Sequence, residues 1–563
     1  MFGKYKLFSY FWKKFFWMID KNNEIFKRVC GDGFEPSPSQ LEIFNFVKYG
    51  IGNGSIESRA GSGKSKTIEL STYFIPSNKK VLILAYNVHI ANNLKQKLKP
   101  LNNVVVYTYH SLGYRLLTST LNKEIKVDEN KYIRYINTHI NELLGNFDDF
   151  SNAEKGRYIK NLEKLLDYSR YNLMQSEKEI AKMAVKYGVK TFSNECEVVR
   201  KLMKWGCENT DCVDYTDMIW LPYEKGIVTA NYFKFDYLFI DEAQDSSLAQ
   251  QHLIDFCMKR NSRFFLFGDS FQMINAWAGS DEDAFKTFNK RANVKKFVLN
   301  ISYRCPKTIA EKAREIVPDF EAYSNAIEGS INYNVSLSEI KPGDMVLCRL
   351  TAPLVKLYLS LIDKNVPVYI KGVEIGKEFI NSINSFQTDD LDKVKLSLKE
   401  NLVKTWEDVA ELYQTDLKSV VGESDVVTIY DEILTLDLLS EGVNDKNELI
   451  NKIKTLFIDK PKNISSEDKN FVHLSTVHRA KGLENDNVFI LCPSLMPNKL
   501  AKKDWEIISE KNLVYVAWTR AKKTLNFISE KEFPPDKSYS GTDVLYKELN
   551  TIRENVKEQI YET

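Results

Sequence analysis

A glycine-rich run at residues 58–65 has the composition of a phosphate-binding loop. The run, SRAGSGKS, follows a short extended stretch and precedes a helical pattern. Glycines allow successive backbone N–H groups to turn onto phosphate oxygens, while Lys64 adds a charge at the β- and γ-phosphates and the Ser65 hydroxyl can ligate Mg²⁺. Further contacts of such a loop would come from Ala60, Gly61, Ser62 and Gly63. Ser58 stands where the usual pattern begins with glycine, and an ordinary Gly/Ser turn before a helix is the alternative.

Two adjacent carboxylates would supply the second half of a nucleotide-hydrolysing site. The apolar segment 237–240 is typical of a buried strand and runs directly into Asp241 and Glu242. Ligands bind at the carboxyl ends of the strands in open α/β sheets, so we expect these acids near the phosphate loop. Asp241 would hold the Mg²⁺, and Glu242 would accept the proton of the attacking water. A helix N-terminus enriched in acids is the alternative, which the phosphate loop disfavours.

Other motifs, taken in order with these two, resemble the UvrD/Rep family of superfamily-one DNA helicases. The resemblance runs from about residue 38 to residue 523, apart from two long insertions. Besides the two motifs above, it is carried by residues 38–41, 84–87, 107–111, 214–218, 267–272, 302–304, 477–484 (VHRAKGLE) and 515–521 (YVAWTRA). It implies an α/β fold with two RecA-like P-loop motor domains, each with a mainly helical insertion.

The resemblance implies a set of contacts to the nucleoside of ATP. Gln40 would make paired hydrogen bonds to the adenine edge, and Tyr303 would stack on the face of the base. Glu484 would accept a hydrogen bond from the ribose. ATP and Mg²⁺ are therefore the expected cofactors.

A further set of family positions concerns the phosphates. Gln272 would bond the γ-phosphate or the water in line with it, and Arg304 and Arg520 would deliver cationic forks to the transferring phosphoryl group. The predicted catalytic set is Lys64, Asp241, Glu242, Gln272, Arg304 and Arg520.

The same resemblance implies groups that bind single-stranded DNA. Aromatic rings can stack on any base, which suits Tyr86 and Trp277 to binding without sequence preference. Thr108, His110 and His478 would bond phosphates or bases. The alternative for Tyr86 and for Trp277 is an ordinary place in the core.

Two positions depart from the family pattern. Residues 275–279 lack its first aromatic side chain and its arginine, which puts one stacking contact and some coupling between DNA and ATP in doubt. Val88 stands where a basic residue is common, and Tyr109 is a further stacking candidate with a core position as its alternative. None of these positions belongs to the hydrolytic groups.

The motifs divide the chain into motor domains and insertions. The expected parts are an N-terminal aromatic and basic extension at 1–30, a first motor domain at 31–115 and 210–300 with a helical insertion at 116–209, a second motor domain at 301–372 and 466–540 with a helical insertion at 373–465, and a C-terminal helix at 541–563. Apolar residues recur at helical spacing in both insertions. The second insertion is shorter than that of the larger bacterial relatives, which leaves the strength of unwinding open.

Composition sets outer limits on this interpretation. The 563 residues are 43% hydrophobic and 27% charged, which excludes disordered, collagen-like and disulfide-scaffold proteins. The formal net charge of +2 excludes a polybasic tail protein, although it says nothing about a local basic groove. The shortage of Gly and Pro and the abundance of Phe and Tyr follow AT-rich codons, which leaves a phage or viral source open.

The eight cysteines and the N-terminus bear on the compartment. None of the cysteines forms a CxxC pair, so we expect reduced thiols and a cytoplasmic location, in the host cytoplasm if the source is viral. The aromatic residues 2–19 are interrupted by Lys13 and Lys14, so the segment is too short and too charged to span a bilayer. It would pack on the protein's own core, with a membrane surface or a partner protein as alternatives.

The function predicted from these residues is an ATP-dependent DNA helicase or translocase that acts on single-stranded DNA and at junctions with duplex. The family resemblance implies 3′ to 5′ movement and a role in replication or repair. Two alternatives remain open: a DNA-stimulated ATPase that strips proteins from single strands, and a nucleotide-gated DNA-binding subunit of a larger assembly. An RNA track is also left open, because no residue is identified as a sensor of the ribose 2′-hydroxyl.

Overall fold

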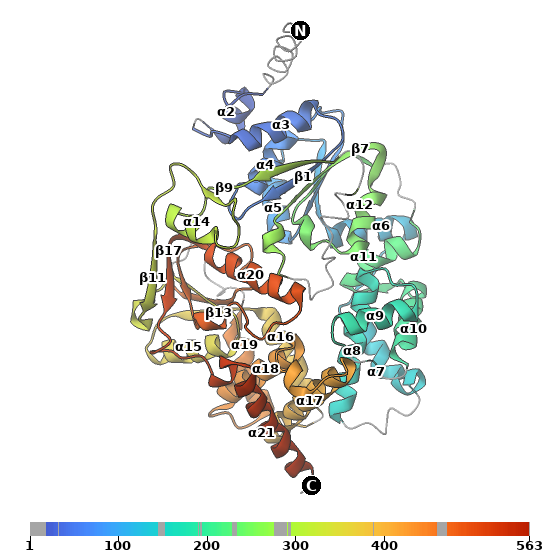
Figure 1. The fold of residues 1–563 in the computed structure, drawn as a ribbon. Coiled ribbons are helices and arrows are strands. Elements are labelled where there is room, and N and C mark those ends of the chain that lie inside the picture. Colours follow the sequence, from blue (N-terminus) through green and yellow to red (C-terminus); the bar gives the residue numbers. More distant parts are fainter. Residues whose placement is uncertain are drawn as a thin grey trace, which may run out of the picture. The chain divides into compact units, whose positions relative to one another are not determined.

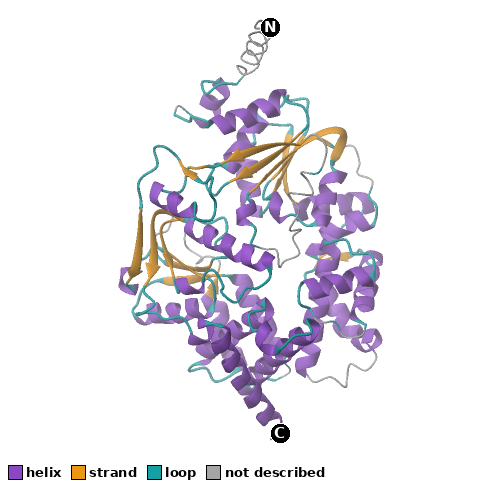
Figure 2. Cartoon of the chain, in the orientation of Figure 1, coloured by secondary structure: helices purple, strands orange, loops and turns teal. Residues whose placement is uncertain are grey.

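The computed structural model describes residues 19–31, 33–144, 152–189, 191, 194–227, 233–274, 290, 294–386, 388–458 and 470–561 (Figure 1). The chain forms two compact units. The first unit comprises Met1–Val127, Asp211–Ser270 and Ser280–Tyr303, and the second comprises Asp128–Thr210, Phe271–Gly279 and Arg304–Thr563, as far as the structure describes them. Strands and helices alternate in both units (Figure 2), which confirms the expected α/β class.

The first unit is built on a six-stranded parallel sheet with the strand order β3-β2-β6-β7-β1-β8. Its strands are β1 (Asn53–Ser58), β2 (Val81–Ala85), β3 (Val104–Thr108), β6 (Phe235–Ile240), β7 (Met258–Gly268) and β8 (Val294–Leu299). All five residues of β2 are buried, as expected for a strand covered on both faces. Because the strands are parallel, the residues that follow them meet at one edge of the sheet.

Helices cover this first sheet. They are α2 (Glu24–Cys30), α3 (Pro38–Tyr49), α4 (Lys64–Thr72), α5 (Val88–Lys97), α6 (Tyr109–Leu121), α11 (Tyr215–Glu224) and α12 (Leu248–Phe256). One apolar core joins α3, α4 and α5 to the strands through side chains such as Ile43, Ile68, Leu94 and Phe239. Ile19 is buried with Phe26 in a neighbouring cluster. The expectation for the aromatic N-terminal segment otherwise falls on residues 1–18, which lie outside the described residues.

The second unit is built on a seven-stranded sheet with the order β11-β17-β16-β12-β15-β13-β14, in which all strand pairs are parallel. Its strands are β11 (Ser330–Val335), β12 (Met345–Cys348), β13 (Val368–Lys371), β14 (Phe457–Ile458), β15 (Val472–Thr476), β16 (Asn485–Ile490) and β17 (Ala521–Ile528). The order of the strands in the sheet differs from their order in the sequence: β12 lies in the middle, and β15 and β16, which come later in the chain, flank it.

Two groups of helices belong to the second unit. The first group is α7 (Lys131–Leu144), α8 (Asn152–Tyr171), α9 (Glu177–Lys186) and α10 (Glu195–Glu208); the second is α14 (Lys307–Ala313), α15 (Ala352–Asp363), α16 (Val373–Ser385), α17 (Leu391–Leu412), α18 (Ser424–Ser440), α19 (Lys446–Leu456), α20 (Asp504–Trp518) and α21 (Thr542–Tyr561). Helix α8 packs on α17, and Arg157 pairs with Asp408 at 3.1 Å. A single apolar core joins α15–α19 and α21 to the sheet.

Short elements complete the fold. They are β4 (Lys126–Val127), which pairs with β5 (Cys212–Val213), β9 (Ile301–Ser302), β10 (Glu321–Ala322), and 3-10 turns at Ala243–Asp245, Ser270–Gln272, Leu337–Glu339, Leu417–Val420, Pro493–Leu495 and Lys537–Ser540. Within the described part of the chain, no helix combines the length and the apolar character needed to cross a membrane.

Candidate ATP-hydrolysis and DNA-binding sites

The phosphate loop lies at the carboxyl edge of the first sheet, between β1 and α4. Gly61 and Gly63 have φ angles of 71° and 78°, in the left-handed region that glycine adopts at no steric cost. Among the described residues, no side chain caps the first turn of α4. The N–H groups at this helix end are therefore available to an anion, as at other phosphate-binding helix starts. The hydroxyl of Ser62 is buried and has no hydrogen-bond partner among the described residues.

Lys64 lies against both predicted carboxylates. Its ammonium is 3.2 Å from Oδ1 of Asp241 and donates a hydrogen bond to Oε1 of Glu242. Burial lowers the pKa of Lys64, but the charges of Asp241 and Glu242 outweigh it, so the pKa lies above its ordinary value. Burial also raises the pKa of Asp241, against the opposing effect of Lys64. Loop, lysine and acids are thus brought together, as the sequence predicts.

The surroundings of Asp241 fit a hard cation. The side chain is only 1% exposed, and apart from the ion pair to Lys64 neither oxygen accepts a hydrogen bond of good geometry from the described residues. A buried carboxylate with spare acceptor capacity is costly unless a cation or a donor reaches it, and Mg²⁺ prefers oxygen ligands. Ser65, the other predicted metal ligand, is exposed at the second position of α4.

Glu242 is held in an unusual backbone conformation. Its φ of 50° lies in the left-handed region, which is uncommon for a residue with a side chain and recurs at functional positions. Oε2 of its carboxylate accepts a 2.6 Å hydrogen bond from Nε2 of Gln244. The carboxylate is thus fixed on one side by Lys64 and on the other by Gln244, a residue that we did not single out from the sequence although it lies in the same motif.

The predicted adenine-binding residues also lie at the loop. A Cβ placed on Gly63 would be 3.4 Å from Nε2 of Gln40 and 3.8 Å from the Tyr303 ring, and the backbone N–H of Tyr303 donates to the carbonyl of Gly61. However, Gln40 is buried and already hydrogen-bonded: Oε1 accepts from the N–H of Ser37, and Nε2 donates to Oγ1 of Thr67. Its amide therefore caps α3 and retains one N–H for a base.

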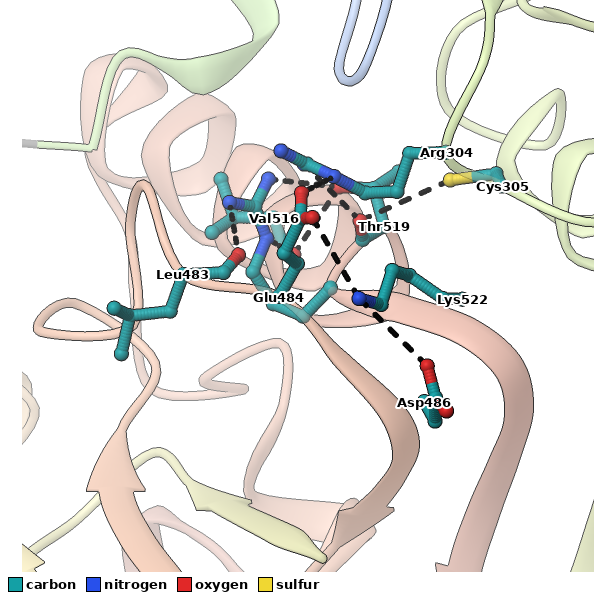
Figure 3. A network of polar contacts seen from close by, with 9 residues as sticks. Arg304, Cys305, Leu483, Glu484, Asp486, Val516, Thr519 and Lys522 are labelled. Atoms are coloured by element: carbon teal, nitrogen blue, oxygen red, sulfur yellow. Dashed lines mark hydrogen bonds and ion pairs between the residues drawn. The ribbon is translucent and has the colours of Figure 1, made fainter. Parts of the chain in front are cut away.

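In the second unit, Arg304 and Glu484 lie together at the amino end of β16 (Figure 3). Arg520 directly precedes β17 and interacts electrostatically with both. Nε of Arg304 donates to Oε2 of Glu484 at 2.6 Å. Burial raises the pKa of Glu484, but the neighbouring cations, Arg304 foremost, more than offset this, so the pKa lies below its ordinary value. The predicted ribose acceptor is therefore an ion-pair partner of a predicted arginine finger.

Arg520 is only 1% exposed and is held by uncharged groups. Its guanidinium donates to the carbonyls of Val516 and Leu483 and to Oγ1 of Thr519, at 2.9, 3.1 and 3.2 Å. Burial and then the charge of Arg304 lower the pKa of Arg520 to about 9. The residue remains a cation at neutral pH, in a fixed orientation.

The segment that carries Gln272 is anchored within the second unit. Nζ of Lys481 donates to the backbone carbonyl of Gln272 at 2.8 Å, and Nδ2 of Asn512 donates to that of Met273 at 2.9 Å. The anchoring groups Lys481 and Asn512 were not expected from the sequence, although Lys481 belongs to the motif at residues 477–484.

Three of the predicted DNA-binding residues lie at the carboxyl ends of strands β2 and β3 of the first unit: Tyr86 follows β2, Thr108 is the last residue of β3 and His110 lies in the first turn of α6. Tyr86 is 43% exposed. Thr108 is buried, and its hydroxyl accepts from the N–H of Ser111 at the start of α6, a helix cap rather than a free contact. Burial lowers the pKa of His110.

The remaining DNA-binding candidates, His478, Tyr109 and Trp277, have different surroundings or fall outside the described residues. His478 follows β15 in the second unit, and burial, with the charges of Arg349 and Arg479, lowers its pKa to about 3. It is therefore uncharged at neutral pH. Tyr109 is buried and bonds the hydroxyl of Ser246 at 3.0 Å, the core alternative considered for it. Trp277 lies outside the described residues.

Comparisons with known proteins agree with the motif order. Residues 40–293 match the family model of the UvrD/REP helicase N-terminal domain, and residues 373–532 match that of the UvrD-like helicase C-terminal domain. The chain is 22% identical to the ATP-dependent DNA helicase Rep of Buchnera aphidicola, over 86% of this chain and 93% of that protein. It is 21% identical to a probable DNA helicase II homolog of Mycoplasma genitalium, with 85% and 83% covered, and 22% identical to the ATP-dependent DNA helicase PcrA of Staphylococcus aureus, with 84% and 80% covered.

Proposed function

The chain belongs to the UvrD/Rep helicase family and is a helicase ATPase, and we propose that it moves along single-stranded DNA in the 3′ to 5′ direction and unwinds duplex at junctions. The observation that carries the hydrolytic part is the contact of Lys64 with Asp241 and Glu242 at the end of a glycine-rich loop. A cation, a buried acid and a base are the groups that phosphoryl transfer to water needs.

In this proposal the phosphates of ATP are bound by the backbone N–H groups of the loop and by Lys64. A phosphate competes with Glu242 for the ammonium, so nucleotide binding releases Glu242 to accept the proton of the attacking water. Asp241 and Ser65 hold Mg²⁺, which supplies charge neutralisation at the phosphate oxygens when bound. Gln40 and Tyr303 bind the adenine.

The second unit supplies the remaining groups of the proposal. Arg304 and Arg520 stabilise the charge that develops on the transferring phosphoryl group, and Gln272 senses the γ-phosphate. Glu484, which pairs with Arg304, would exchange that partner for the ribose. We retain the proposed division into two motor domains with two helical insertions.

For the DNA track we propose stacking on Tyr86 and Trp277 and polar contacts from Thr108, His110 and His478. The exposed ring of Tyr86 supports its assignment as a stacking residue. The hydroxyl of Thr108 already caps α6, so we assign Thr108 only a secondary contact with DNA. The neutral state of His478 supports hydrogen bonding rather than ion pairing. A chain that consumes ATP on DNA acts where both are present, which supports the cytoplasm.

The test is the ATPase rate of the full chain with and without single-stranded DNA. We expect stimulation by DNA, and a loss of about a hundredfold or more in Glu242→Gln because the general base is removed. Glu42→Gln, which changes an exposed carboxylate paired with Lys295, is the matched control and keeps the parent rate.

Tailed substrates then separate the possible outcomes. Displacement of a strand from a 3′-tailed but not a 5′-tailed duplex supports the proposal. Removal of a bound protein from single-stranded DNA without strand displacement would replace it by the protein-stripping alternative. An ATPase that DNA does not stimulate and that Glu242→Gln leaves intact would overturn the motor function.

A further inference from the structure

A buried ionic network lies behind the phosphate loop of the first unit. Arg59, the second residue of the glycine-rich run, is 8% exposed. Its Nη1 atom is 3.3 Å from Oδ1 of Asp269 and 3.3 Å from Oε2 of Glu57. Asp269 is fully buried, whereas 28% of the Glu57 side chain is exposed.

The strand register explains why these residues meet. Glu57 of β1 lies opposite Gly268 of β7, so the residues that follow the two strands are neighbours at the carboxyl edge. Arg59 and Asp269 are 210 positions apart in the sequence. The guanidinium therefore joins the phosphate loop to the start of the segment that carries the predicted γ-phosphate sensor.

The network continues to the proposed catalytic base. The backbone N–H of Asp269 donates to Oε1 of Gln244 at 3.2 Å, and Nε2 of the same amide donates to Glu242 at 2.6 Å. The side-chain amide of Gln244 is therefore hydrogen-bonded to the backbone of Asp269 on one side and to the carboxylate of Glu242 on the other. Arg59 is thus connected to Glu242 through two intervening residues, Asp269 and Gln244.

The other carboxylate fixes the next residue of the sensor segment. Oε2 of Glu57 accepts from the backbone N–H of Ser270 at 3.3 Å and from its hydroxyl at 3.2 Å. Arg59 thus pairs with two acids that between them hold residues 269–270. Removal of the cation would leave a buried and a partly exposed carboxylate close together without the charge of Arg59, a costly arrangement that relaxes by movement of residues 269–270.

We propose that Arg59 is a positioning residue for ATP hydrolysis, which sets the orientation of Glu242 through Asp269 and Gln244 and holds the sensor segment at Ser270. This inference rests on the proposed function of the site. Arg59 itself does not contact the reacting atoms. Its loss should slow the chemical step, because small misplacements of a catalytic group cost up to about a hundredfold in rate, while the phosphate-binding backbone stays in place.

The experiment compares Arg59→Ala and Arg59→Lys with the parent in the full chain, in the presence of Mg²⁺ and saturating single-stranded DNA. The readouts are kcat and KM for ATP, and the affinity for a fluorescent ADP analogue. We expect kcat to fall by about ten- to a hundredfold in Arg59→Ala with ADP affinity within about twofold of the parent. Arg59→Lys should recover part of the rate, because the lysine ammonium keeps the positive charge but lacks the planar set of donors of the guanidinium.

Lys295→Ala, which removes an exposed ion pair of the same unit, is the control and keeps the parent kcat. A kcat of Arg59→Ala within about twofold of the parent overturns the inference, as does a loss of ADP binding that parallels the loss of rate. If Arg59→Ala does not fold, a reduced kcat of Arg59→Lys with intact ADP binding supports the inference and an unchanged kcat overturns it. A parent without ATPase activity overturns the proposed function and this inference with it, whereas an active parent with indifferent Arg59 variants overturns this inference alone.

Discussion

The carboxyl edge of the first sheet and the amino edge of the second hold different kinds of groups. The first edge presents backbone N–H groups, a lysine and two acids around a glycine-rich loop. The second presents two arginines, of which Arg304 pairs with Glu484 and Arg520 is fixed by carbonyl groups. The first edge can bind phosphate by itself, whereas the second supplies oriented positive charge. We therefore expect the first unit to determine the affinity for the nucleotide, and both units to contribute to the rate of its hydrolysis.

The largest expected effect comes from Arg520 of the second unit, and it tests whether that unit contributes to the rate of hydrolysis without contributing to nucleotide affinity. Arg520→Ala should lower kcat for ATP hydrolysis by about a thousandfold, since an arginine finger contributes to the transition state. The affinity for ADP should remain within about twofold, because the loop of the first unit is untouched. The measurement is DNA-stimulated ATPase together with fluorescent ADP binding. A large loss of ADP affinity would show that the second unit also controls binding.

A smaller effect sharpens the comparison within the first unit, where the nucleotide and DNA candidates share one edge. Tyr86→Ala should weaken binding of a single-stranded oligonucleotide by about 1–3 kcal/mol, because one stacked base is lost. ATP hydrolysis without DNA should not change. The check is fluorescence anisotropy with a labelled oligonucleotide, with Val88→Ala, an exposed apolar side chain two positions further along the chain, as control. Equal losses in both variants would assign the effect to the loop rather than to the ring.

The smallest effect concerns the sheet of the second unit. His473 stacks on Tyr369 with the ring centroids 4.9 Å apart, and burial, with the charge of Lys371, lowers its pKa to about 4. The unfolded chain has a histidine pKa near 6.5 and takes up the proton first, so this residue costs stability as pH falls below about 6.5.

His473→Phe keeps the stacked ring and removes that proton. It should therefore lose about 1 kcal/mol less stability than the parent between pH 6.5 and pH 5.5. Denaturant unfolding at the two pH values measures the difference. A variant with the same acid sensitivity as the parent would show that His473 is not neutral in the folded chain.

Local patterns predicted the positions of the strand, the turn and the helix that carry the candidate hydrolytic groups of the first unit. The run of apolar residues before Asp241 folds as β6, and the glycine-rich run forms the turn into α4, because both depend on neighbouring residues only. The contact between Lys64 and the two acids followed from the rule that parallel strands end at one edge.

Contacts that depend on strand order or on competing local bonds could not be predicted. Arg59 was an unremarked position of the loop, because its partner Asp269 is its neighbour only through the pairing of β1 with β7. Gln40 was expected to face a base, but its amide is engaged with Ser37 and Thr67. Arg520 was expected as a finger, and its fixation by three uncharged acceptors required the fold of α20 and the start of β17.

The buried hydroxyl of Ser62 and the carboxylate of Asp241 have a consequence for the lifetime of the protein. Among the described residues, the Ser62 hydroxyl has no hydrogen-bond partner and the Asp241 carboxylate has only its ion pair with Lys64. Buried polar groups with unused hydrogen-bonding capacity favour unfolding, and a nucleotide with its cation would satisfy both. A ligand present at a hundred times its dissociation constant adds about 2.7 kcal/mol to stability. Bound nucleotide should therefore slow proteolysis of the chain, so that the amount of the motor depends on the supply of nucleotide as well as on its synthesis.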